Sequence, residues 1–291
     1  MAEHGPSSNA ARSLRTALTR TLRPLLIAAS VLLLAQQEAR ATHAMGGELS
    51  YDCIGPNLYK VSLNFYRDCN GVAAPTNCNN GLEFNVRSPQ CGANFTQCFA
   101  LESVQVITPI CASETDRCLN PGGTYGVEKY TYSKIVNLAA WAGCGTDWTF
   151  SWSLCCRNNA ITSLTNPGNQ NLYLDATMNN TLGVCNSSPD FLTNPTPFYC
   201  LGQSVSYNPG AFDVDGDSLV FQLIAARGAN GNNLTYAANY SAAQPVRNSG
   251  GINAVQLNAQ TGTMTVVPSV LQVAVVTYRV REYRNGVQIG T

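Results

Sequence analysis

LSYDCIGPNLYKVSLNF, residues 49–65, is the stretch that decides the fold class. Apolar side chains alternate with polar ones over residues 49–53 and again over residues 59–65, and Gly55, Pro56 and Asn57 supply turn chemistry between them. Side chains of a β-strand point alternately to its two faces, so each half buries one face and exposes the other. The stretch therefore predicts a β-hairpin with one apolar face.

The same patterning recurs along the rest of the chain. Up to Cys200 it predicts strands at residues 82–86, 104–108, 128–136, 148–154 and 171–177. After Cys200 it predicts strands at residues 204–207, 219–225, 234–236, 254–257, 264–267 and 273–283. The single helical candidate, residues 135–142, is short. The sequence predicts an all-β protein, with a disulfide-rich antiparallel β module followed by an antiparallel β-sandwich.

The amino terminus has the three parts of a secretory signal peptide. Four arginines precede an apolar run at residues 25–35, and Ala39-Arg40-Ala41 follows as a cleavage signal. A membrane anchor is the alternative, but it needs about 20 apolar residues, roughly twice the length of this run. We therefore predict a signal peptide at residues 1–41 and a secreted or cell-surface protein without a membrane span after cleavage.

Charge excludes two classes of partner. Cleavage after Ala41 leaves 250 residues with 12 Lys and Arg against 15 Asp and Glu, a formal charge of −3. Binding to nucleic acid or to an anionic membrane requires clustered Lys and Arg, and no such cluster occurs here. Neither partner is expected.

An even number of cysteines in an exported chain predicts disulfide bonds. Up to six bridges are expected, with no pairing deducible from the sequence, among Cys53, Cys69, Cys78, Cys91, Cys98, Cys111, Cys118, Cys144, Cys155, Cys156, Cys185 and Cys200. A zinc site is the weaker alternative, because no C-x-x-C spacing occurs. Bridging neighbours would strain the geometry, so Cys155 and Cys156 are expected to reach different partners.

The cysteine distribution also suggests a domain boundary. No cysteine follows Cys200, and a proline-containing stretch at residues 195–202 coincides with this change. We predict a cysteine-rich module at residues 42–200 and a cysteine-free sandwich at residues 201–291. Residues 287–289 begin another strand just before the last residue, so the sandwich is expected to be incomplete and the chain to be the amino-terminal piece of a longer protein. Folded proteins avoid the long unpaired edge that would otherwise remain.

The segment DVDGDSL places Asp213, Asp215 and Asp217 at alternate positions. If the segment is extended, the three carboxylates point to one side and offer the hard oxygen ligands that calcium prefers. Glu282, at the end of the strand predicted at residues 273–283, is a weaker candidate for a fourth ligand. The alternative is a solvated acidic turn, since Asp and Gly favour turns in any case. The glycine position excludes an EF-hand loop.

Enzymatic chemistry has few candidate residues. His43 is the only histidine after the predicted cleavage site, and oxidised cysteines leave no thiolate nucleophile. No catalytic residue is predicted. Trp148, Phe150 and Trp152 share one face of a strand and suit either a platform for sugar rings or a buried core, and the core interpretation is favoured.

Two further stretches carry a family resemblance. THAMGGELSYDCIGPNLYKVSLNFYRDCNG (residues 42–71) resembles the start of large secreted surface proteins of gliding bacteria that use type IX secretion. AFDVDGDSLVFQL (residues 211–223), together with NAQTGTM (residues 258–264), resembles a cadherin-like or immunoglobulin-like repeat. The resemblance implies further repeats and a sorting domain beyond this chain, and it favours calcium over the solvated turn.

These observations predict a non-enzymatic secreted or cell-surface structural or adhesion protein. Its partner would be an unidentified surface ligand, either a glycan or another cell-surface protein. The alternative prediction is a carbohydrate-binding module of a secreted hydrolase whose catalytic domain lies beyond residue 291. In that alternative, the aromatic side chains of Trp148 and Trp152 would bind the sugar.

Overall fold

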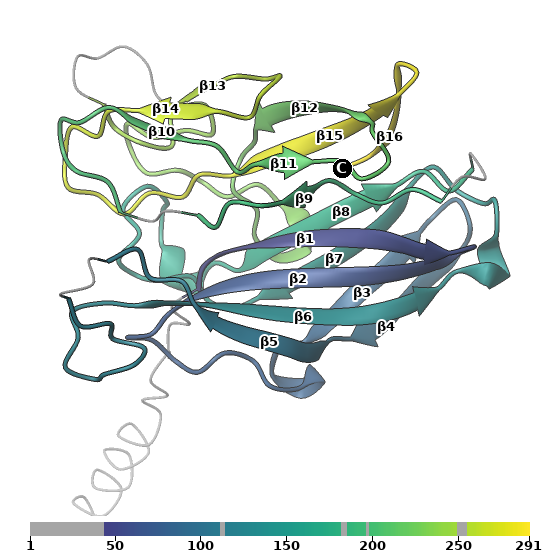
Figure 1. The fold of residues 1–291 in the computed structure, drawn as a ribbon, viewed down its shortest axis with the longest axis horizontal. Helices are drawn as coiled ribbons and strands as arrows, with labels where there is room; N and C mark the ends of the chain where they lie inside the picture. The colour runs from purple at the N-terminus through teal and green to yellow at the C-terminus, as the bar shows by residue number, and fades with distance from the viewer. Residues whose placement is uncertain (1–43, 111–113, 182–184, 196–197, 249–254) are drawn as a thin grey trace, which may run out of the picture. The chain divides into compact units, whose positions relative to one another are not determined.

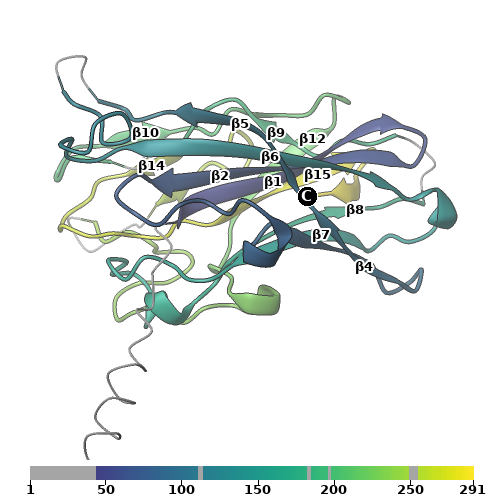
Figure 2. The same ribbon diagram turned by 90° about the horizontal axis from the view of Figure 1, so that it is seen from below.

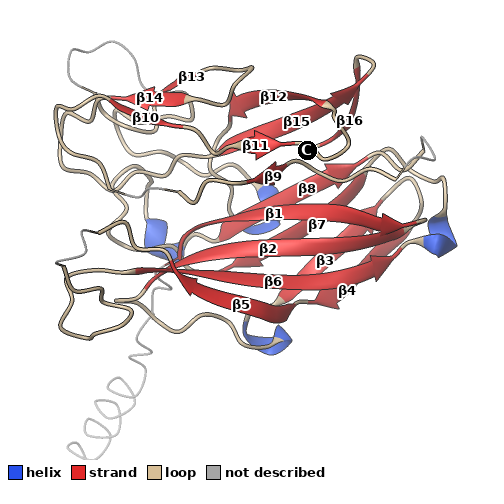
Figure 3. Cartoon of the chain, in the orientation of Figure 1, coloured by secondary structure: helices blue, strands red, loops and turns tan. Residues whose placement is uncertain are grey.

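The structure is a computed structural model that describes residues 44–110, 114–181, 185–195, 198–248 and 255–291. The regular secondary structure of these residues is β-strand apart from four 3-10 helices, η1 (Cys78–Asn80), η2 (Ala139–Trp141), η3 (Pro167–Asn169) and η4 (Ala229–Gly231). Within the sheets all strands pair antiparallel (Figure 3). The all-β prediction is confirmed.

Two larger and two smaller sheets make up the fold (Figure 1). The four-stranded sheet has the order β1 (Ala44–Gly55), β2 (Leu58–Asp68), β6 (Val127–Asn137), β5 (Ala100–Val106). The seven-stranded sheet has the order β12 (Ser218–Leu223), β15 (Tyr278–Arg284), β16 (Val287–Gly290), β8 (Leu172–Met178), β7 (Trp148–Leu154), β3 (Glu83–Ser88), β4 (Ala93–Cys98). The smaller sheets are β10 (Val205–Tyr207), β14 (Met264–Val266), β13 (Gln256–Leu257), and β11 (Ala211–Phe212) with β9 (Asp190–Phe191).

The predicted hairpin is formed by β1 and β2. Asn57 in the turn has a φ of +58°, a conformation that asparagine tolerates better than most residues. Tyr51 faces Val61 and Leu49 faces Leu63 across the pair, and the predicted apolar face of β2 is buried along its whole length. Alternation in the sequence thus produces one buried face, as expected.

The main core lies between the four-stranded sheet and the strands β8, β7, β3 and β4, which form two layers in Figure 2. Ring contacts cross the gap between these layers. The ring centroids of Tyr51 and Phe150 are 5.5 Å apart, and those of Phe65 and Trp152 are 5.8 Å apart. Apolar burial of this kind is the main driving force for the two sheets to pack together.

The aromatic residues of β7 belong to this core. Trp148, Phe150 and Trp152 have at most 1% of their surface exposed. Both indole N–H groups are satisfied internally, because Trp148 donates to the carbonyl of Cys144 and Trp152 to that of Gly81, each at 2.7 Å. The core interpretation is confirmed, and the platform for sugar rings is wrong, since no face of these rings reaches solvent.

The seven-stranded sheet crosses the predicted domain boundary. Gly290 of β16 pairs with Met178 of β8, the N–H of Asn179 donates to the carbonyl of Ile289 at 2.8 Å, and that of Thr291 donates to Thr177 at 3.0 Å. The described residues fall within one compact unit. The structure therefore does not divide at Cys200 into residues 42–200 and 201–291, because strands from both parts share one sheet.

The unpaired edge expected beside residues 273–283 is also not present in the part of the chain that the structure describes. Strand β15 pairs with β12 on one side and with β16 on the other. The turn between β15 and β16 contains Asn285 and Gly286, both with positive φ, the pattern of a tight hairpin.

Three local predictions need correction, and some strands were missed. The candidate helix at residues 135–142 is wrong, because β6 runs to Asn137 and only the turn of η2 follows. Strands β4, β9 and β11 were not predicted. Residues 234–236 make an isolated bridge, between Leu164 and Tyr236, instead of a strand. The strand predicted at residues 273–283 begins only at Tyr278.

Five disulfide bonds join ten of the eleven cysteines in the described residues. The pairs are Cys53–Cys185, Cys69–Cys118, Cys78–Cys98, Cys91–Cys144 and Cys155–Cys156. The last pair corrects the expectation of separate partners: these neighbours bond to each other across a cis peptide bond, which sets their Cα atoms 3.1 Å apart. Cys200 is exposed and unpaired among these residues, and Cys111 lies outside them.

The predicted signal peptide at residues 1–41 and His43 lie outside the described residues. Within the described residues, no helix has the length and apolar character required to cross a membrane. The disulfide bonds are compatible with an extracellular protein.

Candidate metal site

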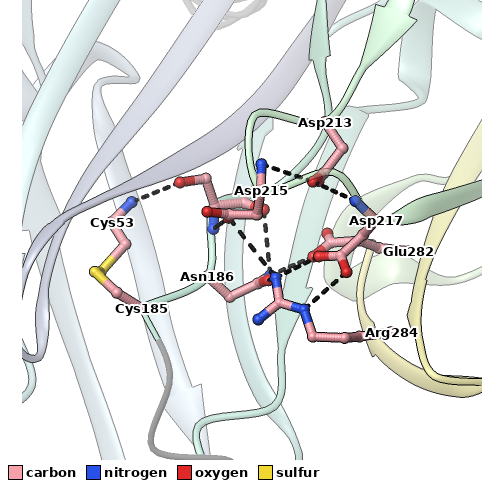
Figure 4. A network of polar contacts seen from close by, with 9 residues as sticks. Cys53, Cys185, Asn186, Asp213, Asp215, Asp217, Glu282 and Arg284 are labelled. Atoms are coloured by element: carbon pink, nitrogen blue, oxygen red, sulfur yellow. Dashed lines mark hydrogen bonds and ion pairs between the residues drawn. A yellow bond between two sulfur atoms is a disulfide. The ribbon is translucent and has the colours of Figure 1, made fainter.

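The candidate metal site begins with the loop that follows β11, residues 213–217 (Figure 4). Asp213 Oδ1 accepts hydrogen bonds from the backbone N–H groups of Asp215 and Asp217, both at 2.9 Å. The N–H of Gly216 donates to the carbonyl of Asp213, and Gly216 has a φ of +83°, which glycine adopts without steric cost. The segment is therefore a turn closed around Asp213. The extended conformation considered for it in the sequence is wrong.

Strand β15 brings Glu282 and Arg284 to this loop. Residues two apart in a strand face the same side, so both side chains point toward the turn (Figure 4). Carboxylate oxygens of Asp213, Asp217 and Glu282 all lie within 4.8 Å of one another. Glu282, the weakest of the predicted ligands, is 0% exposed and lies at the buried side of the cluster.

Arg284 supplies positive charge to the cluster. Its Nε donates to Asp217 Oδ1 at 2.8 Å and its Nη2 to Asp217 Oδ2 at 2.5 Å, a bidentate ion pair. The same Nη2 donates to the side-chain oxygen of Asn186 at 2.8 Å. The Asp217 side chain is 4% exposed, so this pair is shielded from water and stronger than a typical surface pair.

Asp215 does not belong to the group of converging carboxylates. Its Oδ2 accepts a hydrogen bond from the backbone N–H of Ser187 at 2.8 Å and lies 4.0 Å from Arg284 Nη2. Residue Asp215 is exposed. Of the three predicted aspartates, the structure brings Asp213 and Asp217 together and turns Asp215 toward a different segment.

That segment, residues 185–188, connects the site to the amino-terminal hairpin. The N–H of Cys53 donates to Ser187 Oγ at 3.2 Å. The N–H of Tyr51 donates to Ser188 Oγ at 2.8 Å, and the N–H of Ser188 donates to the Tyr51 carbonyl, also at 2.8 Å. The Cys53–Cys185 disulfide fixes the segment covalently. The site therefore lies where β1, residues 185–188, the 213–217 loop and β15 meet.

Among the residues that the structure describes, two carboxylate oxygens at this site find no hydrogen-bond partner. Glu282 Oε1 accepts from the side-chain amide of Asn186, but Glu282 Oε2 and Asp213 Oδ2 are both buried and unbonded. Burial, opposed by the Asn186 hydrogen bond and augmented by the nearby charges of Asp213 and Asp217, raises the pKa of Glu282 to about 8. Burial also raises the pKa of Asp213.

Close packing encloses Glu282 Oε2. A Cβ atom added to Gly290 would lie 2.7 Å from this oxygen and 2.7 Å from the Tyr51 hydroxyl oxygen. Tyr51 is 0% exposed, and its hydroxyl donates to the carbonyl of Thr177 at 3.1 Å. Because Gly290 on β16 has no side chain, the space beside Glu282 Oε2 stays free of protein atoms that would clash with it.

A second set of possible ligands in the described residues, Cys69, Cys118 and Glu128, is not a metal site. The two cysteines form a disulfide bond, and Glu128 pairs with Arg67 at 2.7 Å. Arg67 also donates to the backbone carbonyls of Gly71 and Val72. This arginine, whose position next to Asp68 in the sequence invites a catalytic interpretation, is a structural ion-pair partner.

Sequence reasoning missed Asn186 and Arg284. Arg284 lay just beyond the strand predicted at residues 273–283, and only the observed extension of β15 to Arg284 places it two residues after Glu282 on the same face. Asn186 had no sequence signal, since it comes from a segment without regular structure and reaches the site only through the fold.

No protein-family model matches the chain, and comparisons with curated proteins and with solved structures give no match either. The resemblance to surface proteins of gliding bacteria and to cadherin-like repeats stays a prediction.

Proposed function

We propose that the chain is a non-enzymatic, secreted or cell-surface structural or adhesion protein. One observation carries the proposal: ten of the eleven described cysteines are consumed in disulfide bonds. Disulfides form and persist in oxidising surroundings such as the cell exterior. A sulfur atom in a disulfide is no longer a thiolate nucleophile, so these cysteines serve structure.

The positions of the bridges support a structural role. Cys53–Cys185 joins residues 132 apart in sequence and ties the first strand to the segment beside the acidic site. Cys69–Cys118 and Cys91–Cys144 close loops of 49 and 53 residues. Cross-links over such long loops stabilise chiefly by restricting the unfolded chain, with typical contributions of about 2–4 kcal/mol each. A domain of this kind suits exposure to shear and proteases.

Export is tested with the full chain produced in a bacterium. We expect the protein in the medium or at the protease-accessible surface, with almost all thiols unreactive until a reductant is added. A protein retained in the cytoplasm with reactive cysteines would contradict the proposal.

Adhesion is tested by coating beads with the exported protein and measuring their retention on cells and on immobilised glycans. Beads coated with reduced and alkylated protein are the control, and we expect them to lose retention. Equal retention of both preparations would contradict a role for the folded domain. Turnover of polysaccharide or peptide by the purified protein would contradict the non-enzymatic assignment.

A further inference from the structure

We propose that Asp213, Asp217 and Glu282 form a calcium site that joins the 213–217 loop to strand β15. The inference goes beyond the proposed surface role and does not depend on it. It differs from the ligand set expected from the sequence, in which Glu282 was peripheral and Asp215 was a ligand.

Glu282 carries the first part of the argument. Its side chain is 0% exposed, and Oε2 has no hydrogen-bond donor within the described residues. Buried acceptors in folded proteins nearly always have a partner, because an unpaired one keeps its full desolvation cost. The Asn186 amide satisfies only the other oxygen, Oε1. No group in the described residues donates to Oε2, and a bound cation would satisfy it.

Asp213 independently shows the same deficit. Its Oδ1 is used within the turn, and its Oδ2 is buried without a partner. The carboxylates of Asp213, Asp217 and Glu282 offer oxygens within 4.8 Å of one another. Two oxygens bound to one calcium ion at 2.3–2.6 Å are separated by at most about 5.2 Å, so the three groups can reach a common ion. Two elements thus contribute carboxylates to one cluster, and in each element one of these carboxylates has an unpartnered oxygen within the described residues.

Charge points to a divalent cation. The three carboxylates face one guanidinium, that of Arg284, which is bonded to Asp217. Asp215 adds a fourth carboxylate, 4.0 Å from the same guanidinium, so the ionised acids outnumber the positive charge and a bound divalent cation would reduce the excess. All the available ligands are oxygens, which suits a hard cation such as calcium better than a transition metal.

Asp215 provides an internal comparison. It lies in the same loop and carries the same charge, but its Oδ2 is directed to the N–H of Ser187 and its residue is exposed. Asparagine at this position keeps the accepting oxygen. Asp215→Asn therefore removes one charge near the site without removing a ligand, and it is the matched control for Asp213→Asn.

Calcium at this point would hold together segments that are far apart in the chain. Residues 213–217 and β15 supply the ligands, while Asn186, hydrogen-bonded to both Glu282 and Arg284, belongs to the segment that the Cys53–Cys185 bridge fixes. An ion bound only by the folded state stabilises it by mass action. Calcium is expected to raise the melting temperature of the full chain.

The experiment measures calcium affinity by isothermal titration calorimetry and melting temperature by circular dichroism, using the oxidised full chain. Wild type is expected to melt several degrees higher in millimolar calcium than in chelator. Glu282→Gln and Asp213→Asn should each weaken calcium binding by about tenfold or more, at least as much as the loss of an outer-shell residue. Asp215→Asn should bind close to wild type. If Glu282→Gln does not fold, as judged by near-UV circular dichroism, Asp213→Asn in the solvent-accessible loop carries the test.

Three results would overturn the proposal. One is a wild-type melting temperature that is the same in calcium and in chelator, which would mean that Glu282 carries a proton instead of facing an ion. The second is unchanged calcium affinity in both Glu282→Gln and Asp213→Asn. The third is an equal response to magnesium, which would exclude a calcium site. Each of these results would overturn the calcium site alone. The export and adhesion assays measure other properties, so the proposed surface role would still stand or fall on them.

Discussion

Folding partly shields Glu48 from water and fully buries Glu282, and neither glutamate forms an ion pair within the part of the chain that the structure describes. Glu48 accepts hydrogen bonds from the Tyr66 hydroxyl at 3.1 Å and the Asn64 amide at 3.5 Å, and Tyr66 is itself 3% exposed. Burial outweighs these donors and the charge of Lys129, and it raises the pKa of Glu48 from 4.5 to about 7, with a further upward contribution from Asp190. The folded protein therefore holds a proton here more tightly than the unfolded chain.

Replacing Glu48 by glutamine should flatten the dependence of stability on pH. A carboxyl group whose pKa is raised by folding penalises the folded state once it ionises, so wild-type stability falls as pH rises through the interval from about 4.5 to about 7 and stays low above it. Glu48→Gln cannot ionise. We expect the variant to be about 2 kcal/mol more stable than wild type near pH 8 and nearly equal near pH 4. Urea unfolding across this range measures both.

The exposed residue Glu114 provides the control. Glu114→Gln removes an exposed carboxylate and is the control for the loss of one negative charge, with an expected change in the free energy of unfolding at pH 7 of at most about 0.5 kcal/mol. A Glu48→Gln profile parallel to that of wild type would show that Glu48 ionises normally in the folded protein.

The limits of sequence reasoning at single residues are visible in the acidic cluster. Asp213 and Asp217 were identified because like charges at close spacing require an explanation. Glu282 stood at the end of the strand predicted at residues 273–283, but Arg284 lay beyond it, so neither their common face nor the element opposite them was predicted. The role of Asn186 depends on where a long irregular segment passes, and no local pattern encodes that.

Strand β1 contains two adjacent glycines that face opposite sides. A Cβ atom on Gly46 would meet nothing within 4 Å, whereas one on Gly47 would lie 2.9 Å from the carbonyl oxygen of Asn64 and 2.8 Å from Leu174 Cδ1. Asn64 belongs to β2 and Leu174 to β8. Gly47 therefore lies where β1 approaches both its partner strand and the facing sheet.

Gly47→Ala should destabilise the protein, while Gly46→Ala should not. The added methyl at residue 47 must displace backbone of β2 as well as a leucine side chain, and overpacking of this kind costs about 1–3 kcal/mol. Gly46 has open space and no positive φ, so alanine there is expected to be neutral or slightly stabilising. Chemical denaturation of the two variants beside wild type measures the difference.

Equal stability of the two glycine variants would mean that β1 can shift away from β2 and β8 without cost. Loss of stability in both would point instead to the backbone freedom of the glycine pair.

Strands with clear alternation were predicted well, and the others were not. Strand β7 was predicted with its observed ends, because Trp148, Phe150 and Trp152 mark one face without interruption. Strand β4 was missed, since it lies at the edge of its sheet and only Ala93 in it is buried. Residues 135–142 suggested a helix because a strand end and a 3-10 turn together resemble a short apolar helical run.

The order of strands in the seven-stranded sheet shows what the sequence could not reveal about the whole molecule. The contact between β16 and β8 joins residues more than 100 positions apart, and Ile289 at this contact is 2% exposed. Changes of composition suggested a boundary near Cys200, but cysteine content follows the positions of cross-links and not the path of a sheet. Disulfide pairing was equally hidden, because it depends on the same long-range contacts.

Cysteine counting leads to the last prediction, a sixth bridge between Cys111 and Cys200. Five bridges leave these two of the twelve cysteines, and Cys200 is exposed. The rings of Tyr125 and Phe198 are 4.3 Å apart, so the segment before Cys200 lies against the loop that precedes β6, the loop whose sequence includes Cys111. In an oxidising compartment, the two cysteines that remain are expected to pair.

Mass spectrometry of the exported protein, alkylated under denaturing but non-reducing conditions, measures this directly. Wild type should show no alkylated cysteine, and Cys200→Ser should expose a single reactive thiol, at Cys111. Cys53→Ser serves as the matched control, since its released thiol should be Cys185. Alkylation of Cys200 in the wild-type protein would refute the sixth bridge and leave an exposed thiol on the surface, which an oxidising exterior would readily convert into an intermolecular disulfide.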